Sequence, residues 1–89
     1  MANKRPVHEH LYICLGKTIA KRRKQLNLSQ QELAELSGVN RAFLSNVEQG
    51  KRNPSIGAVA SIAQGLSMRI SRLLVKCDEC IKEIEQEAS

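Results

Sequence analysis

The chain has 89 residues, a formal net charge of +5, one Phe, one Tyr and no Trp, and its pI is near 9.5. A chain of this length forms one small domain whose core must rest on Leu, Ile, Val and Ala, which favours helices over a β-sandwich. No run of 18 apolar residues is present, and the first ten residues lack the apolar centre of a signal peptide. We therefore expect an all-α, cytoplasmic protein with no membrane partner.

Charge is divided unevenly along the chain. Residues 1–56 contain ten Lys or Arg against four Asp or Glu, whereas residues 77–89 contain one Lys against five acidic residues. The result is a basic body with an acidic tail, and a polyanion is the expected partner of the body.

The first predicted helix follows a short polar segment. Residues 1–10 contain Pro6 and mixed charge, so we expect a flexible N-terminal arm. From Leu11 to Leu26 the apolar residues recur near helical spacing, with cations elsewhere around the helix. This pattern predicts a helix over residues 11–26.

A capping signal marks the second predicted helix. Ser29 followed by Glu32 is a capping box, in which the hydroxyl and the carboxylate accept hydrogen bonds from backbone N–H groups that a helix start leaves unpaired. The helix is expected over Gln30 to Ser37. Gly38 then ends it, because a residue without Cβ adopts positive φ at little steric cost.

A third helix is expected to start immediately after this turn. Asn40 is a suitable N-cap for a helix over Arg41 to Gln49, whose inward positions are Leu44 and Val47. Two short helices joined by a Gly-containing turn form a helix-turn-helix.

Residues 11–74 resemble the Cro and phage-repressor (XRE) family of helix-turn-helix proteins. The resemblance rests on the segments "LSQQELAELSGV", "LSNVEQGKRNPS" and "IAQGL". It implies a compact five-helix, lambda-repressor-like domain over residues 11–75, followed by a C-terminal helical extension over residues 76–89. In that family the third helix enters the major groove of double-stranded DNA, and the second lies across the backbone. "GKRNPS" also resembles the controller proteins of restriction-modification systems.

The third predicted helix has an outward polar edge suited to reading bases. Arg matches the O6 and N7 atoms of guanine, Asn matches the N6 and N7 atoms of adenine, and Ala meets the methyl group of thymine. An ordinary solvated helix face is the alternative, which the motif context disfavours. The expected base-reading residues are Arg41, Ala42, Ser45 and Asn46.

Other polar residues are expected to position the protein on DNA. Gln30 at the start of the second helix and the loop residues Lys51, Arg52 and Asn53 are donors suited to phosphate groups, although a merely soluble loop is the alternative. Phe43 either packs beneath the third helix, which we favour, or touches a sugar and a thymine methyl.

The resemblance also implies a structural ion pair. Arg23 and Glu48 stand where the family has a partly buried pair that ties its first helix to its third. We therefore assign both residues to structure rather than to DNA contact.

The fourth and fifth helices are expected after Pro54. Ser55 is a suitable cap for the fourth, but Ser67 stands where the family usually has Gly after Leu66, so Ser67 is a candidate cap for the fifth. The fifth helix carries a narrow apolar stripe, which is typical of a helix that needs a partner. We expect this stripe to join two copies in a homodimer through Leu73, Cys77, Cys80, Ile81 and Ile84. A rival surface includes Ile70 and Met68.

The three cysteines are an odd number, and in the cytoplasm they are expected to be thiols. "CDEC" with "HEH" near the N-terminus raises the possibility of zinc, but no second close pair lies at the spacing of a zinc finger. Redox switching is another alternative. We favour apolar packing of the cysteines, with no metal and no cofactor.

Two functions remain in view. The favoured one is a sequence-specific transcriptional regulator that binds double-stranded DNA as a homodimer on a two-fold symmetric operator. The alternative is an antitoxin-like module whose helix-turn-helix mainly serves a complex with another protein, and the acidic C-terminal extension keeps it open. No set of residues suited to catalysis is apparent, so we expect no enzyme.

Overall fold

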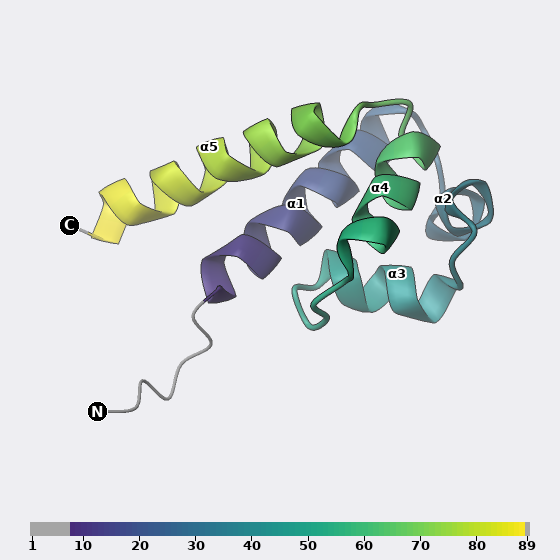
Figure 1. Cartoon of the computed structure of the whole chain (residues 1–89), viewed down its shortest axis with the longest axis horizontal. Helices are drawn as coiled ribbons and strands as arrows, with labels where there is room; N and C mark the ends of the chain where they lie inside the picture. Colours follow the sequence, from purple (N-terminus) through teal and green to yellow (C-terminus); the bar gives the residue numbers. More distant parts are fainter. Residues whose placement is uncertain (1–7, 89) are drawn as a thin grey trace.

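The computed structural model describes residues 8–88, which contain five helices and no strand (Figure 1). This confirms the all-α, five-helix prediction. None of these helices is long and apolar enough to cross a membrane. The helices are α1 (Glu9–Gln25), α2 (Gln30–Ser37), α3 (Arg41–Glu48), α4 (Ile56–Gly65) and α5 (Ile70–Ala88).

The N-terminal arm predicted over residues 1–10 falls mostly outside the described residues. Glu9 and His10 are described, and both already belong to α1. The first helix therefore begins two residues before its predicted start at Leu11.

The start of α2 has the predicted capping box. The Ser29 hydroxyl accepts a hydrogen bond from the Glu32 backbone N–H at 3.0 Å, and the Glu32 carboxylate accepts one from the Ser29 N–H at 2.8 Å. The backbone hydrogen bond from Ser29 lowers the pKa of Glu32, because it stabilises the ionised carboxylate. At the other end Gly38 has φ +70°, as the predicted turn requires.

Side chains also cap α3 and α4. The Asn40 Oδ1 atom accepts from the Phe43 N–H at 2.7 Å, and the Ser55 hydroxyl accepts from the Ala58 N–H at 3.0 Å. Each cap satisfies a backbone donor that has no partner within its helix. Local sequence therefore sets where these two helices start.

Helix α1 is the central element of the fold. It packs against α3 on one side and α5 on the other, while α2 packs against α4 (Figure 1). The core between the helices is aliphatic, as the composition predicts. Its largest fully buried side chains are Ile19, Leu33, Leu44, Ile62, Leu66, Leu73, Val47, Cys14 and Cys77.

The backbones of α1 and α3 come into direct contact at Gly16. A Cβ atom on this residue would lie 2.5 Å from the carbonyl oxygens of both Val47 and Glu48. No side chain fits there, so glycine allows the C-terminal end of α3 to rest on α1.

The turn between α4 and α5 uses Ser67 differently from the prediction. Ser67 has φ +56°, in the left-handed region that favours glycine. The Met68 N–H donates to the Ala63 carbonyl at 2.9 Å, which closes the end of α4. Ser67 thus follows the end of α4 and does not cap α5, whose first helical residue is Ile70.

Helix α5 is one continuous helix that lies along α1, so residues 76–88 prolong a core helix (Figure 1). Leu73 is 0% exposed and Cys77 is 1% exposed, and both belong to the core. Their expected role in a dimer is therefore wrong, because α1 already covers them. Ile81 and Ile84 are partly buried against the same core.

The cysteine prediction also needs correction. Cys14 on α1 and Cys80 on α5 form a disulfide, with Cα atoms 5.7 Å apart and 66 residues of separation in sequence. Cys77 is a free thiol, and its burial raises its pKa. Since Cys80 is bonded to Cys14, Cys77 and Cys80 cannot serve together as a pair of zinc thiolates. The disulfide makes a covalent link between α1 and α5.

This link gives a testable expectation for stability. Without reductant, Cys80→Ser should lower the free energy of unfolding by about 2–4 kcal/mol, because the uncrosslinked unfolded chain gains conformational freedom. Urea unfolding of both proteins, with and without dithiothreitol, measures the effect. The difference should vanish in dithiothreitol, and a loss of the same size in both conditions would contradict the proposed cause.

Candidate nucleic-acid interface

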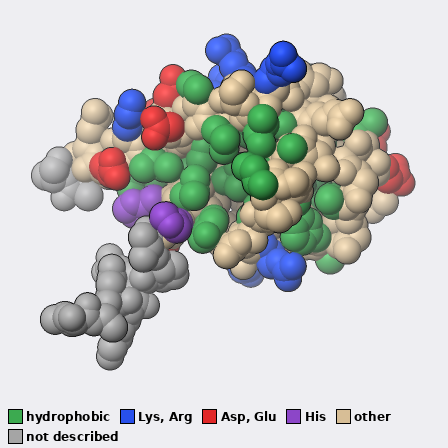
Figure 2. Space-filling view, viewed as in Figure 1, with side chains coloured by type: hydrophobic (Ala, Val, Ile, Leu, Met, Phe, Trp, Pro, Cys, Tyr) green, Lys and Arg blue, Asp and Glu red, His purple; other side chains and the backbone are tan. Residues whose placement is uncertain are grey.

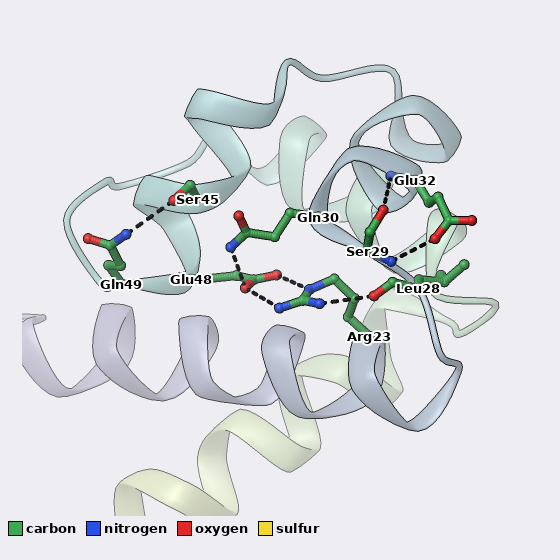
Figure 3. A network of polar contacts seen from close by, with 8 residues as sticks. All are labelled: Arg23, Leu28, Ser29, Gln30, Glu32, Ser45, Glu48 and Gln49. Atoms are coloured by element: carbon green, nitrogen blue, oxygen red, sulfur yellow. Dashed lines mark hydrogen bonds and ion pairs between the residues drawn. The ribbon is translucent and has the colours of Figure 1, made fainter.

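The helix-turn-helix is tied to α1 by the ion pair that the family resemblance implies. The Arg23 Nε atom donates to Glu48 Oε2 at 2.8 Å, and Nη2 donates to Oε1 at 3.0 Å (Figure 3). The side chains are only 12% and 6% exposed. The hydrogen bond to Glu48 raises the pKa of Arg23, so the pair stays charged.

The same pair also reaches α2 and the segment before it. Arg23 Nη1 donates to the Leu28 carbonyl at 2.9 Å, which holds the chain just ahead of α2. Gln30, the first residue of α2, donates its Nε2 to Glu48 Oε1 at 3.0 Å (Figure 3). Gln30 was predicted to contact phosphate, but in this structure its amide is part of the network that joins three helices.

The outward face of α3 presents the residues predicted to read bases. Arg41 and Ala42 are exposed, and Ser45 and Asn46 are half-buried. On the opposite face Leu44 and Val47 are buried in the core. The helix is therefore held from behind by apolar side chains while its polar side chains point outward.

Gln49 is a polar residue of this face that the sequence analysis missed. It is exposed and donates its Nε2 to the Ser45 hydroxyl at 3.1 Å (Figure 3). Its spacing of four residues from Ser45 is the signal in the sequence that would have placed the two residues on one helix face. Ser45 and Gln49 together form a hydrogen-bonded polar pair on this face.

The loop after α3 carries the exposed residues Lys51, Arg52 and Asn53. The Lys51 N–H donates to the Asn46 carbonyl at 2.9 Å, which anchors the start of the loop to α3. The Arg52 Cζ atom lies 5.2 Å from the centre of the Phe43 ring. This cation–π contact, also absent from the sequence analysis, holds the guanidinium close to α3.

Phe43 itself is half-buried and packs against the core. The favoured interpretation, packing beneath α3, agrees with this position. The ring also supports Arg52, so Phe43 links the core to the cationic loop.

Comparisons with known proteins place this geometry in a family. A helix-turn-helix family model matches residues 19–73, so the chain belongs to this helix-turn-helix family. An uncharacterised HTH-type transcriptional regulator, y4dJ from Sinorhizobium fredii, is 32% identical over 65 residues, which cover 73% of this chain and 84% of the relative.

Solved structures of restriction-modification controller proteins share the fold. C.AhdI from Aeromonas hydrophila is 32% identical with a TM-score of 0.68, and the match covers 70% of this chain and 94% of that one. C.Esp1396I, solved as a tetramer in complex with its 35-base-pair operator, is 25% identical with a TM-score of 0.74, and the match covers 80% of this chain and 93% of that one.

The buried ion pair gives a prediction for stability. Glu48→Gln should lower the free energy of unfolding by about 3–5 kcal/mol, because it leaves the Arg23 charge buried without its carboxylate. Glu35→Gln is the matched control, since Glu35 is an exposed carboxylate on α2 and its loss should change stability by about 0.5 kcal/mol or less. Urea unfolding measures both variants, and equal losses would show that the pair has no special role.

Proposed function

We propose that this chain is a transcriptional regulator that binds a specific sequence of double-stranded DNA as a homodimer on a two-fold symmetric operator. One observation carries the proposal: α3 is held by core contacts and by the Glu48 ion pair, while its polar side chains point into solvent. A helix supported in this way is suited to enter the major groove as a rigid element. The relatives named as regulators and controllers support the same function.

Within this proposal the residues of α3 and its loop take different roles. Arg41, Ala42, Ser45 and Asn46 read base edges, and Gln49 joins them through its hydrogen bond to Ser45. The phosphate contacts come from the loop residues Lys51, Arg52 and Asn53. Gln30 contacts phosphate at the start of α2 through its backbone N–H, because its Nε2 atom already donates to Glu48.

Selection of bound sequences from a random DNA pool tests the function and provides a cognate site. Arg41→Ala or Asn46→Ala should then lose about 1–3 kcal/mol of binding free energy, mainly on the selected site. Lys51→Ala should weaken binding to selected and random DNA alike and lower the salt slope by about one unit. A salt series measured by fluorescence anisotropy gives both quantities. Equal losses of Arg41→Ala on selected and random DNA would refute its reading role.

The dimer in this proposal uses the exposed edge of the apolar side of α5, next to the part of that side that α1 covers. Ile70, Leu74 and Ile81 lie on one side of this helix, and Leu74 is 38% exposed. Figure 2 shows apolar side chains gathered over the middle of the molecule, below α5 in this view and over the region where Figure 1 places α1 and α4. This surface combines Ile81 of the predicted stripe with Ile70 of the predicted rival surface.

Sedimentation of two charge substitutions tests this dimer surface. Leu74→Asp should shift the protein to monomer, because each copy would place a carboxylate in an apolar contact. Val75→Asp is the matched control, since Val75 is 52% exposed on another side of α5 and its substitution should leave the dimer intact. A dimer that survives Leu74→Asp, or a wild-type chain that is monomeric at high micromolar concentration, would contradict the proposal.

A further inference from the structure

A basic groove of about 750 Å³ lies between α1 and α5. Its α1 wall and its α5 wall both carry cations, and the turn before α5 adds another. Two carboxylates, Glu79 and Glu83, line it farther along α5. The cations that line the groove are Lys17, Lys21, Arg22, Arg69, Arg72 and Lys76.

None of the cations that line this groove forms an ion pair with a described residue. Within residues 8–88 the ion pairs are Arg23 with Glu48 and Lys82 with Asp78, and neither pair lines the groove. The six cations outnumber the two carboxylates of the lining, so the groove keeps a net positive charge and its cations repel one another. An anion bound among them would relieve this repulsion.

The groove has a partly fixed geometry. Arg22 is half-buried and donates its Nε to the Leu66 carbonyl at 3.2 Å, which positions its guanidinium beside the turn before α5. The disulfide of Cys80, which lines the groove, ties the two walls together. The walls therefore cannot separate freely in the oxidised protein.

The spacing of the cations suits a chain of anionic groups. Lys17 and Lys21 stand four residues apart on α1, and Arg72 and Lys76 stand four residues apart on α5, so each wall places two of its cations about 6 Å apart along its helix axis. The planar guanidinium of Arg binds phosphate oxygens through two parallel hydrogen bonds. The two rows of cations, one on each wall, suit the successive phosphates of a nucleic-acid backbone better than a single small anion.

This groove is separate from the two surfaces already assigned. Helix α1 lies between α3 and α5, so the groove and the outward face of α3 are on different parts of the molecule (Figures 1 and 3). On α5, Arg72 and Lys76 project from a different side than Ile70 and Leu74. Figure 2 likewise shows Lys and Arg side chains beyond α5, apart from those near α3. A dimer formed through the apolar side would leave the groove open.

We propose that the groove between α1 and α5 is a second polyanion site, which binds the phosphate backbone of a DNA segment other than the segment in contact with α3. The inference goes beyond sequence reading, because backbone phosphates are the same in every sequence. The carboxylates of Glu79 and Glu83 repel phosphate, so they mark the end of the site.

The experiment measures a second duplex binding to a chain whose α3 is already occupied. The protein is saturated with its selected site, and a fluorescent duplex of unrelated sequence is then titrated in a salt series. Lys21→Gln with Arg72→Gln should weaken binding of the second duplex by about tenfold and lower the salt slope by about two units, as expected for two lost phosphate contacts. Affinity for the selected site should change far less.

The matched control is Lys24→Gln with Lys82→Gln, which removes the same charge from exposed positions that do not line the groove. It should leave second-duplex binding within about twofold of wild type. Equal losses in the two double variants, or no binding of a second duplex by the wild-type complex, would overturn the proposal.

Sodium tripolyphosphate distinguishes a free polyphosphate from DNA as the source of the phosphates. If tripolyphosphate binding depends on Lys21 and Arg72 while duplex binding does not, the assignment to DNA is wrong. If no selected sequence exists, the unrelated duplex is titrated into the free chain, and the same difference between the double variants is expected. This arm of the experiment shows whether the groove binds DNA even if α3 does not read a specific sequence.

Discussion

The carboxylate of Glu48 is the point at which α1, α2 and α3 are joined. It accepts hydrogen bonds from Arg23 of α1 and Gln30 of α2 while standing at the end of α3. Close by, Gly16 lets the carbonyl groups of Val47 and Glu48 rest on the α1 backbone. The polar contacts and the backbone contact act on the same end of α3, so they set its position together. The position of every outward side chain of α3 therefore depends on these contacts at Glu48 and Gly16.

Local features of the fold were predictable because local chemistry determines them. The caps Ser29, Asn40 and Ser55 each satisfy a backbone donor three residues ahead, and this spacing is visible in the sequence. The same holds for the turn between α2 and α3, where Gly38 has the positive φ that its place in the sequence predicts. The partner of the α5 stripe was not predictable in this way. Periodicity shows that a helix has an apolar side but not whether that side meets α1 or a second copy.

Long-range pairing explains the other differences. Cys14 and Cys80 are 66 residues apart, and their contact depends on how α1 and α5 lie together. The residues of the candidate site could be chosen by type, since Arg, Lys, Asn and Gln are the donors that DNA requires. The contacts that these residues make could not be predicted. The contacts of Gln30 with Glu48 and of Arg52 with Phe43 join residues that come together only after folding.

The backbone contact at Gly16 has a consequence for how new binding specificities arise. Since α3 is located by carbonyl groups, buried aliphatic residues and one ion pair, its position does not depend on its exposed residues Arg41 and Ala42. Stability and target choice therefore rest on separate sets of residues, and their substitutions should be nearly additive. If the outward face reads bases as we propose, a few exchanges on it would redirect the protein to another operator while the scaffold stays intact, which would make this small domain well suited to divergence and to redesign.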